Sequence, residues 1–183
     1  NFFSEDEEKK LELNFIKNQI VVTHSYGFHW FLKNQIKCIG LINFFGSPDY
    51  INYQILSKRK KLMLTKMIEN FKQNPEEVLK QFYKRCGINF NFKSLNFDNL
   101  LSALENMYID KLDDELFNIN HQIESYYSLN DPIFTPSINK IGKLKMFNHS
   151  IKFLKEKDHL LPMKQPKKAL GFIEKFIKNR ICL

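Results

Sequence analysis

The sequence predicts an α/β protein whose parallel sheet is interrupted by a helical insertion. Short apolar runs of strand length, such as Ile20-Val21-Val22, alternate with amphipathic helical segments toward both ends of the chain. Between 49 and 107 the strand patterns vanish and helical segments take their place. Because strands that alternate with helices are typical of parallel sheets, we expect a core at 1–48 and 108–183, with 49–107 inserted as a helical cap.

The elements of the core follow in order along the chain. A Ser4-x-x-Glu7 capping box is expected to start a helix that runs to about Lys17. Strands are expected at 18–24, 36–45, 121–128 and 149–154, and helices at 25–34, 136–145 and 166–180. The insertion is expected to hold helices at 54–72, 75–86 and 97–107, with Pro75 at a helix start and Gly87 at a helix end.

Composition narrows the classes of function. The 183 residues suit one domain with a sizeable core, and the net charge is +8. Only three of the 28 basic residues are arginine, whereas nucleic-acid readers usually rely on arginine for bidentate contacts. We expect no nucleic-acid partner, and the basic surface suits an acidic protein instead.

The cysteines and the hydropathy of the chain indicate the cellular compartment of the protein. Cys38, Cys86 and Cys182 are scattered without metal-ligand spacing, so we expect free thiols, no metal and a cytoplasmic protein. No apolar run approaches the roughly 18 residues of a membrane span, and we expect no membrane partner, no cofactor and a monomer. The chain starts at Asn1 rather than at Met, so we expect that an N-terminal part is missing and do not exclude a lost signal peptide.

Thr23-His24-Ser25-Tyr26-Gly27 follows the first expected strand and precedes a helix. A sharp strand-to-helix turn with serine at its apex is the setting of a nucleophile elbow, whose consensus is Gly-x-Ser-x-Gly. Gly27 fits the consensus, but Thr23 replaces the first glycine. The alternative is an ordinary turn in which Ser25 caps the helix.

Two further candidates follow the later strands. Asp131 lies just past the strand at 121–128, and His159 lies in the loop after the strand at 149–154. Because functional sites of α/β sheets form at the carboxyl ends of the strands, both side chains are expected beside Ser25. The alternatives are an ordinary Asp131-Pro132 turn and a solvated loop histidine. The other histidines lie within or beside the expected elements and are weaker candidates: His24, His29, His121 and His149.

The chain order Ser25, Asp131, His159 is the order of the α/β-hydrolase superfamily. The chain resembles that superfamily over nearly its whole length. Within it, the chain resembles the biotin-pathway carboxylesterases that hydrolyse the methyl ester of pimeloyl-acyl-carrier protein. The resemblance rests on Thr-His-Ser-Tyr-Gly at 23–27, Leu-Asn-Asp-Pro-Ile-Phe at 129–134 and Asp-His-Leu-Leu-Pro at 158–162, while the segment at 100–110 resembles the return from the family's cap.

The resemblance implies the C-terminal half of an α/β-hydrolase sheet with a helical lid at 49–107. Ser25 would be the nucleophile, His159 the general base and Asp131 the residue that orients it. The backbone N–H of Tyr26 would be one oxyanion-hole donor, and the second donor would precede this chain. Generic esterases, thioesterases and lipases of this fold remain open, as does a hydrolase-fold module that binds without catalysis.

The lid is expected to carry the contacts to substrate and partner. Its aromatic and aliphatic residues are expected mostly in the core, and the others could wall an acyl tunnel; they are Tyr50, Tyr53, Met63, Met67, Phe71, Phe82 and Tyr83. Its basic residues are either a solvated helix face or a docking surface for acyl-carrier protein. The candidate substrate or partner residues are Lys58, Arg59, Lys60, Lys61, Lys84, Arg85 and Phe82.

Overall fold

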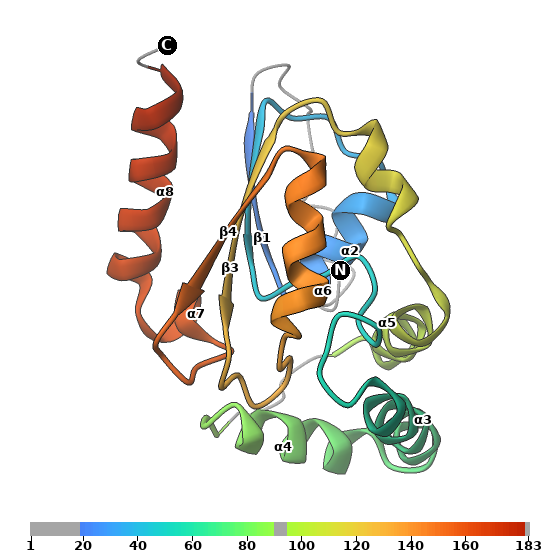
Figure 1. The fold of residues 1–183 in the computed structure, drawn as a ribbon. Coiled ribbons are helices and arrows are strands. Elements are labelled where there is room, and N and C mark those ends of the chain that lie inside the picture. The colour runs from blue at the N-terminus through green and yellow to red at the C-terminus, as the bar shows by residue number, and fades with distance from the viewer. Residues whose placement is uncertain (1–18, 90–94, 182–183) are drawn as a thin grey trace.

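A computed structural model describes residues 19–89 and 95–181 of the chain (Figure 1). The expected helix from Ser4 to Lys17 and the thiol of Cys182 lie outside the described residues. Four parallel strands form one sheet in the order β1-β2-β3-β4. The strands are β1 (Ile20–His24), β2 (Gly40–Phe44), β3 (Gln122–Ser128) and β4 (His149–Leu154). The carboxyl ends of all four strands therefore lie at one edge of the sheet.

The expected strand at 36–45 starts too early. The strand β2 begins at Gly40 and is buried throughout. The apolar residues Ile36 and Cys38 before it pack against the core without pairing as strand. Their hydrophobicity reflects partial burial in the approach to the strand, and contact with the core alone does not distinguish a paired segment from an unpaired one.

Helices cover both faces of the sheet. They are α2 (Tyr26–Lys33), α3 (Ser57–Gln73), α4 (Pro75–Arg85), α5 (Phe97–Ile109), α6 (Ile138–Gly142), α7 (Leu161–Lys164) and α8 (Pro166–Ile181), with short 3-10 helices η2 (Asp114–Asn118) and η3 (Lys143–Phe147). The single helix expected at 136–145 is wrong, because it divides into α6 and η3 at Gly142. None of the described helices is long and apolar enough to span a membrane.

Alternation along the strands separates two cores. Leu41 and Tyr127 point to the face that α2 and α6 cover, whereas Ile42 and Tyr126 point to the face that α8 covers. Figure 1 shows α6 in front of the sheet and α8 on its other side. Since adjacent strand residues point to opposite faces, the central strand β2, which is buried on both faces, is near-continuously apolar.

The inserted helices α3, α4 and α5 gather at the carboxyl edge of the sheet (Figure 1). They pack on one another around Leu64, Phe71 and Leu79. The side chains of Asn74 and Asn96 cap α4 and α5 by accepting hydrogen bonds from backbone N–H groups. The insertion therefore has a hydrophobic cluster of its own above the strand ends, and its action as a lid stays a prediction.

A chain of buried polar side chains crosses the sheet beneath α2. Thr23 donates to Asn43 Oδ1 at 3.3 Å, Asn43 Nδ2 donates to Ser125 Oγ at 2.9 Å, and Ser125 Oγ lies 2.5 Å from His149 Nε2. Burial lowers the pKa of His149 to about 3. Because a buried imidazolium would lose its hydration, His149 stays neutral in the folded protein at neutral pH.

We expect this histidine to make the fold acid-sensitive. The unfolded chain binds a proton at His149 below pH 6.5, whereas the folded chain does so only near pH 3. The contribution of His149 to the free energy of unfolding is therefore fully present above pH 6.5 and is lost as the pH falls toward 3. The loss is on the order of 3 kcal/mol at pH 4. Urea unfolding from pH 7 to pH 4 measures this slope. The slope should be shallower in His149→Gln, and an equal slope in both proteins would contradict the assignment.

Candidate active site

Ser25 lies at a sharp turn between β1 and α2. Its backbone has φ 52° and ψ −122°, a region that side chains rarely adopt, and its N–H donates to Phe44 O at 2.8 Å. Such strain costs about 1–3 kcal/mol and collects at functional sites. The Ser25 side chain makes no capping hydrogen bond to α2. The hydroxyl group is therefore held at the apex by the backbone and is not used as a helix cap.

The tight contact at this turn lies at Gly46 rather than at position 23. A Cβ atom on Gly46 would lie 2.4 Å from Phe28 Cβ and 2.6 Å from Ser25 O. A Cβ atom on Gly27 would meet only Thr23 Cβ, at an ordinary 3.8 Å. The threonine that departs from the Gly-x-Ser-x-Gly pattern is thus accommodated, and the loop after β2 supplies the glycine on which the elbow rests.

Asp131 and His159 meet Ser25 at the carboxyl edge of the sheet. His159 Nε2 lies 2.9 Å from Ser25 Oγ, and His159 Nδ1 lies 2.6 Å from Asp131 Oδ2. The other carboxylate oxygen, Oδ1, accepts from the backbone N–H groups of Ile133 and Phe134. Asp131 is 2 % exposed and His159 is 1 % exposed. His159 is therefore not a solvated loop histidine, and Asp131 both stabilises the turn that follows it and contacts His159.

Two aromatic rings flank His159. The ring of Phe45 lies 5.7 Å from the His159 ring, and the ring of His24 lies 5.2 Å from it. Phe45 adopts φ 60° and directly follows β2, as Ser25 directly follows β1. Sequence reasoning missed both residues as part of the site. Phe45 could have been found as the residue that follows a buried strand at the carboxyl edge.

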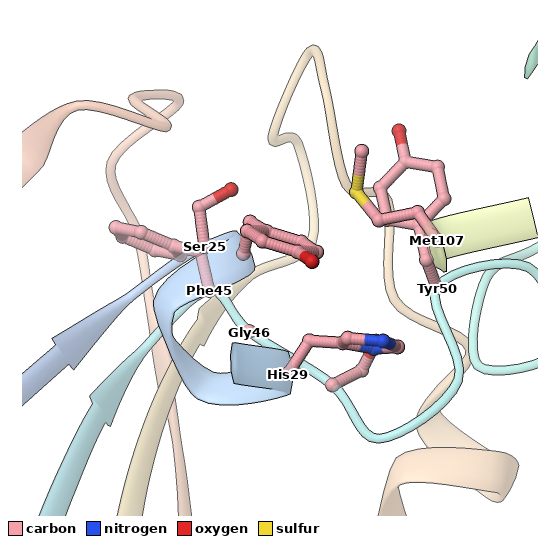
Figure 2. Close-up of a pocket in the computed structure, with 8 residues that line it drawn as sticks. Ser25, His29, Phe45, Gly46, Tyr50 and Met107 are labelled. Carbon is pink, nitrogen blue, oxygen red and sulfur yellow. The ribbon is translucent and has the colours of Figure 1, made fainter. Parts of the chain in front are cut away.

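A narrow pocket opens beside Ser25 (Figure 2). The pocket is lined by Ser25, Tyr26, His29, Phe45, Gly46, Ser47, Tyr50 and Met107. Tyr50 is the one residue of the expected acyl tunnel that lines it. Met107, which comes from the inserted helix α5, was not expected. Tyr53 and Phe71 are buried in the cores, and Met67 and Tyr83 pack around the cluster of the insertion.

Asn106 of α5 and Asp110, which directly follows α5, bind side chains of α2. Asn106 Nδ2 donates to Tyr26 Oη at 3.2 Å, and the Tyr26 ring stacks on His29 at 5.3 Å. Asp110 Oδ2 lies 3.1 Å from His29 Nε2 and accepts from Lys33 at 2.8 Å. Although burial favours the neutral acid, these two hydrogen bonds hold the pKa of Asp110 below its ordinary value. Burial also lowers the pKa of His29. These contacts connect the inserted helix α5 to α2, the helix that follows Ser25.

The expected partner-binding residues of the insertion divide into two groups. Lys58, Arg59, Lys61, Lys84 and Arg85 are exposed. Lys60 is partly buried and donates to Ile133 O at 3.3 Å, and burial, with a further effect of Arg85, lowers the pKa of Lys60. Lys61 lies 5.2 Å above the ring of Tyr108.

Phe82 is not part of the pocket wall. It packs against Cys86, Ile133 and Leu160, where α4 meets the loops that carry Asp131 and His159. Its place is therefore a junction between the insertion and the two loops.

Other chemistry is sparse in the part of the chain that the structure describes. Among residues 19–89 and 95–181, no group of three or more His, Cys, Asp or Glu side chains could hold a metal ion. Cys38 Sγ lies 3.0 Å from His121 Nε2 beside the amino ends of the strands. Burial raises the pKa of this thiol to about 11, so it is a poor nucleophile.

Comparison with known proteins identifies the fold. No protein-family model and no curated protein matches the sequence. Among solved structures, an esterase from Exiguobacterium antarcticum has a TM-score of 0.72 at 13% identity, covering 94% of this chain and 71% of the esterase. A bromoperoxidase from Bacillus anthracis has a TM-score of 0.71 at 14% identity, covering 94% of this chain and 72% of that protein. An epoxide hydrolase from Bacillus megaterium has a TM-score of 0.60 at 15% identity, covering 95% of this chain and 74% of that protein. The chain has the α/β-hydrolase fold, which confirms the predicted fold class.

Proposed function

We propose that this chain is a serine hydrolase that cleaves carboxylic esters, with Ser25 as nucleophile, His159 as general base and Asp131 as the residue that orients the base. One observation carries the proposal: the hydrogen-bonded series from Ser25 Oγ through His159 to Asp131, placed at a strained turn beside a pocket. A nucleophile, a base and an orienting carboxylate in mutual contact are the groups that acyl transfer requires.

The protonation states follow from the partners. Asp131 Oδ2 accepts the Nδ1–H of His159, which leaves the Nε2 lone pair facing the Ser25 hydroxyl. Nε2 takes the proton as Ser25 Oγ attacks the acyl carbon, and returns it to the leaving alcohol as the carbon–oxygen bond breaks. Water then attacks the acyl-serine by the same route. The backbone N–H of Tyr26, at the N-terminus of α2, would donate to the oxyanion.

The nucleophile favours esters over epoxides. Attack of a serine oxygen on an acyl carbon gives an ester, which a histidine-activated water can hydrolyse. Attack on an epoxide carbon would give an ether, which has no carbonyl for water to attack. A serine at the apex of the turn therefore supports acyl transfer.

The finer proposal is the methyl ester of pimeloyl-acyl-carrier protein. Two observations support it: the sequence resemblance at the elbow, acid and histidine loops, and the exposed basic residues of the insertion. Acyl-carrier proteins are acidic, and complementary charge mainly raises the association rate of two proteins. Hydrolysis of small esters without such a partner is the alternative on the same site.

Charge reversal on the insertion should separate these substrates. We expect Lys58→Glu, Arg59→Glu and Lys84→Glu together to lower kcat/KM for a carrier-bound methyl ester by about tenfold at low salt and by less at high salt, because screening weakens steering. Hydrolysis of p-nitrophenyl acetate should hardly change. The matched control reverses Lys167, Lys175 and Lys178, which are exposed on α8, a helix outside the insertion.

Each outcome points to one reading. An equal loss on both substrates would mean that the three residues stabilise the insertion. A loss on neither substrate would leave a small-ester esterase or thioesterase. No hydrolysis of any ester would favour a binding module of the same fold.

A further inference from the structure

His24 ends strand β1 and directly precedes the proposed nucleophile. Its ring nitrogen Nε2 lies 2.7 Å from the backbone oxygen of His159. Its ring also meets the His159 ring at 5.2 Å between centroids and the Phe45 ring edge-on at 6.1 Å. The residue is therefore fixed between the loop that carries His159 and the end of β2.

The protonation of His24 follows from this contact. A backbone oxygen only accepts hydrogen bonds, so Nε2 must carry the proton and donate it. Burial, together with the nearby His159 ring, lowers the pKa of His24 to about 4, although the hydrogen bond to the His159 backbone and the charges of Asp131 and Asp158 act in the opposite direction. At neutral pH His24 is thus an uncharged donor with a defined tautomer.

We propose that His24 is a positioning residue of the proposed esterase, because its Nε2–H holds the main chain of His159 at the distance that the reaction needs. The inference rests on the proposed function. Two consecutive residues of one segment bind the same histidine: Ser25 binds its side chain at 2.9 Å, and His24 binds its backbone at 2.7 Å. The spacing between nucleophile and base is therefore set locally.

The neutral state of His24 also suits the reaction. His159 becomes an imidazolium while it holds the serine proton. Asp131 stabilises that charge at 2.6 Å, and a neutral His24 ring beside it adds no repulsion. A positively charged side chain in the place of His24 would repel the His159 imidazolium and oppose its formation.

Two variants test this role. A Gln side chain can place its amide N–H near the position of imidazole Nε2, whereas Phe keeps a flat ring without a donor. With p-nitrophenyl acetate, His24→Phe should lower kcat about tenfold at an unchanged KM, since it removes one partly buried neutral hydrogen bond that orders the base. His24→Gln should stay within about twofold of the unmodified protein. Thermal unfolding of both variants separates loss of position from loss of fold.

The proposal is overturned if His24→Phe keeps full kcat, or if the Gln and Phe variants lose activity equally. An NMR measurement without substrate tests the contact between His24 and the His159 backbone independently. In the full chain labelled with ¹⁵N-histidine, the His24 signals, assigned by their loss in His24→Phe, should show a neutral Nε2–H ring at pH 7. A charged ring or an Nδ1–H ring would refute the contact. Absence of Ser25-dependent hydrolysis would instead reject the proposed function, so the two failures are distinguishable.

Discussion

Replacing Ser25 by alanine should lower kcat/KM for ester hydrolysis by about 10⁴-fold or more. The variant loses the oxygen that attacks the acyl carbon, while His159 and Asp131 keep their contact at 2.6 Å. Only binding and the polar surroundings would then assist a water molecule, so a small residual rate is expected. The measurement is kcat/KM with p-nitrophenyl acetate, with the unfolding temperature taken in parallel.

Ser102→Ala is the matched control for this variant. Ser102 is exposed on α5, outside the pocket, and its loss should leave the rate unchanged. A Ser25→Ala protein that is folded and hydrolyses esters at the unmodified rate would exclude serine catalysis at this site.

Asp131→Asn should lower kcat by about 10³–10⁴-fold at neutral pH. Asp131 Oδ1 accepts from Ile133 N at 2.7 Å and from Phe134 N at 2.9 Å. The amide oxygen of asparagine would keep those two bonds, which turns its NH₂ group toward His159. The imidazole would then present the Nδ1 lone pair to the amide and Nε2–H to Ser25, the tautomer that cannot accept the serine proton.

The test compares kcat of Asp131→Asn with that of Asp114→Asn, an exposed aspartate on η2. KM should change little in either variant, because the change concerns the base rather than the pocket. Equal activity of the two variants would contradict the orienting role of Asp131.

Chain order and strand context predicted where the three side chains lie. Ser25, Asp131 and His159 each follow a strand, and the carboxyl ends of parallel strands meet at one edge whatever the loops between them do. The fold class followed from the same alternation. These features depend on local patterns and on one rule of topology, and both can be read from a single sequence.

The features of the fold and the site that the sequence did not predict depend on contacts between segments that are distant in sequence. The approach to β2 is apolar because Ile36 and Cys38 are partly buried against the core, so the start of pairing at Gly40 could not be seen. The close approach under the elbow lies at Gly46, far from the serine motif in sequence. Lys60 reads as a surface charge but donates to Ile133 O. Met107 and His24 join the site through packing that no periodicity records.

Covalent labelling tests the central claim most directly. A fluorophosphonate reacts with an activated serine by forming an oxygen–phosphorus bond and releasing fluoride, and it needs no knowledge of the natural substrate. After labelling of the full chain and tryptic digestion, mass spectrometry should find the phosphonyl group on Ser25, in the peptide 18–33 that lies between the cleavage sites at Lys17 and Lys33. Labelling should be absent in Ser25→Ala and strongly slowed in Asp131→Asn. A folded protein that stays unlabelled, or that is labelled at another residue, would contradict the assignment of Ser25 as the nucleophile.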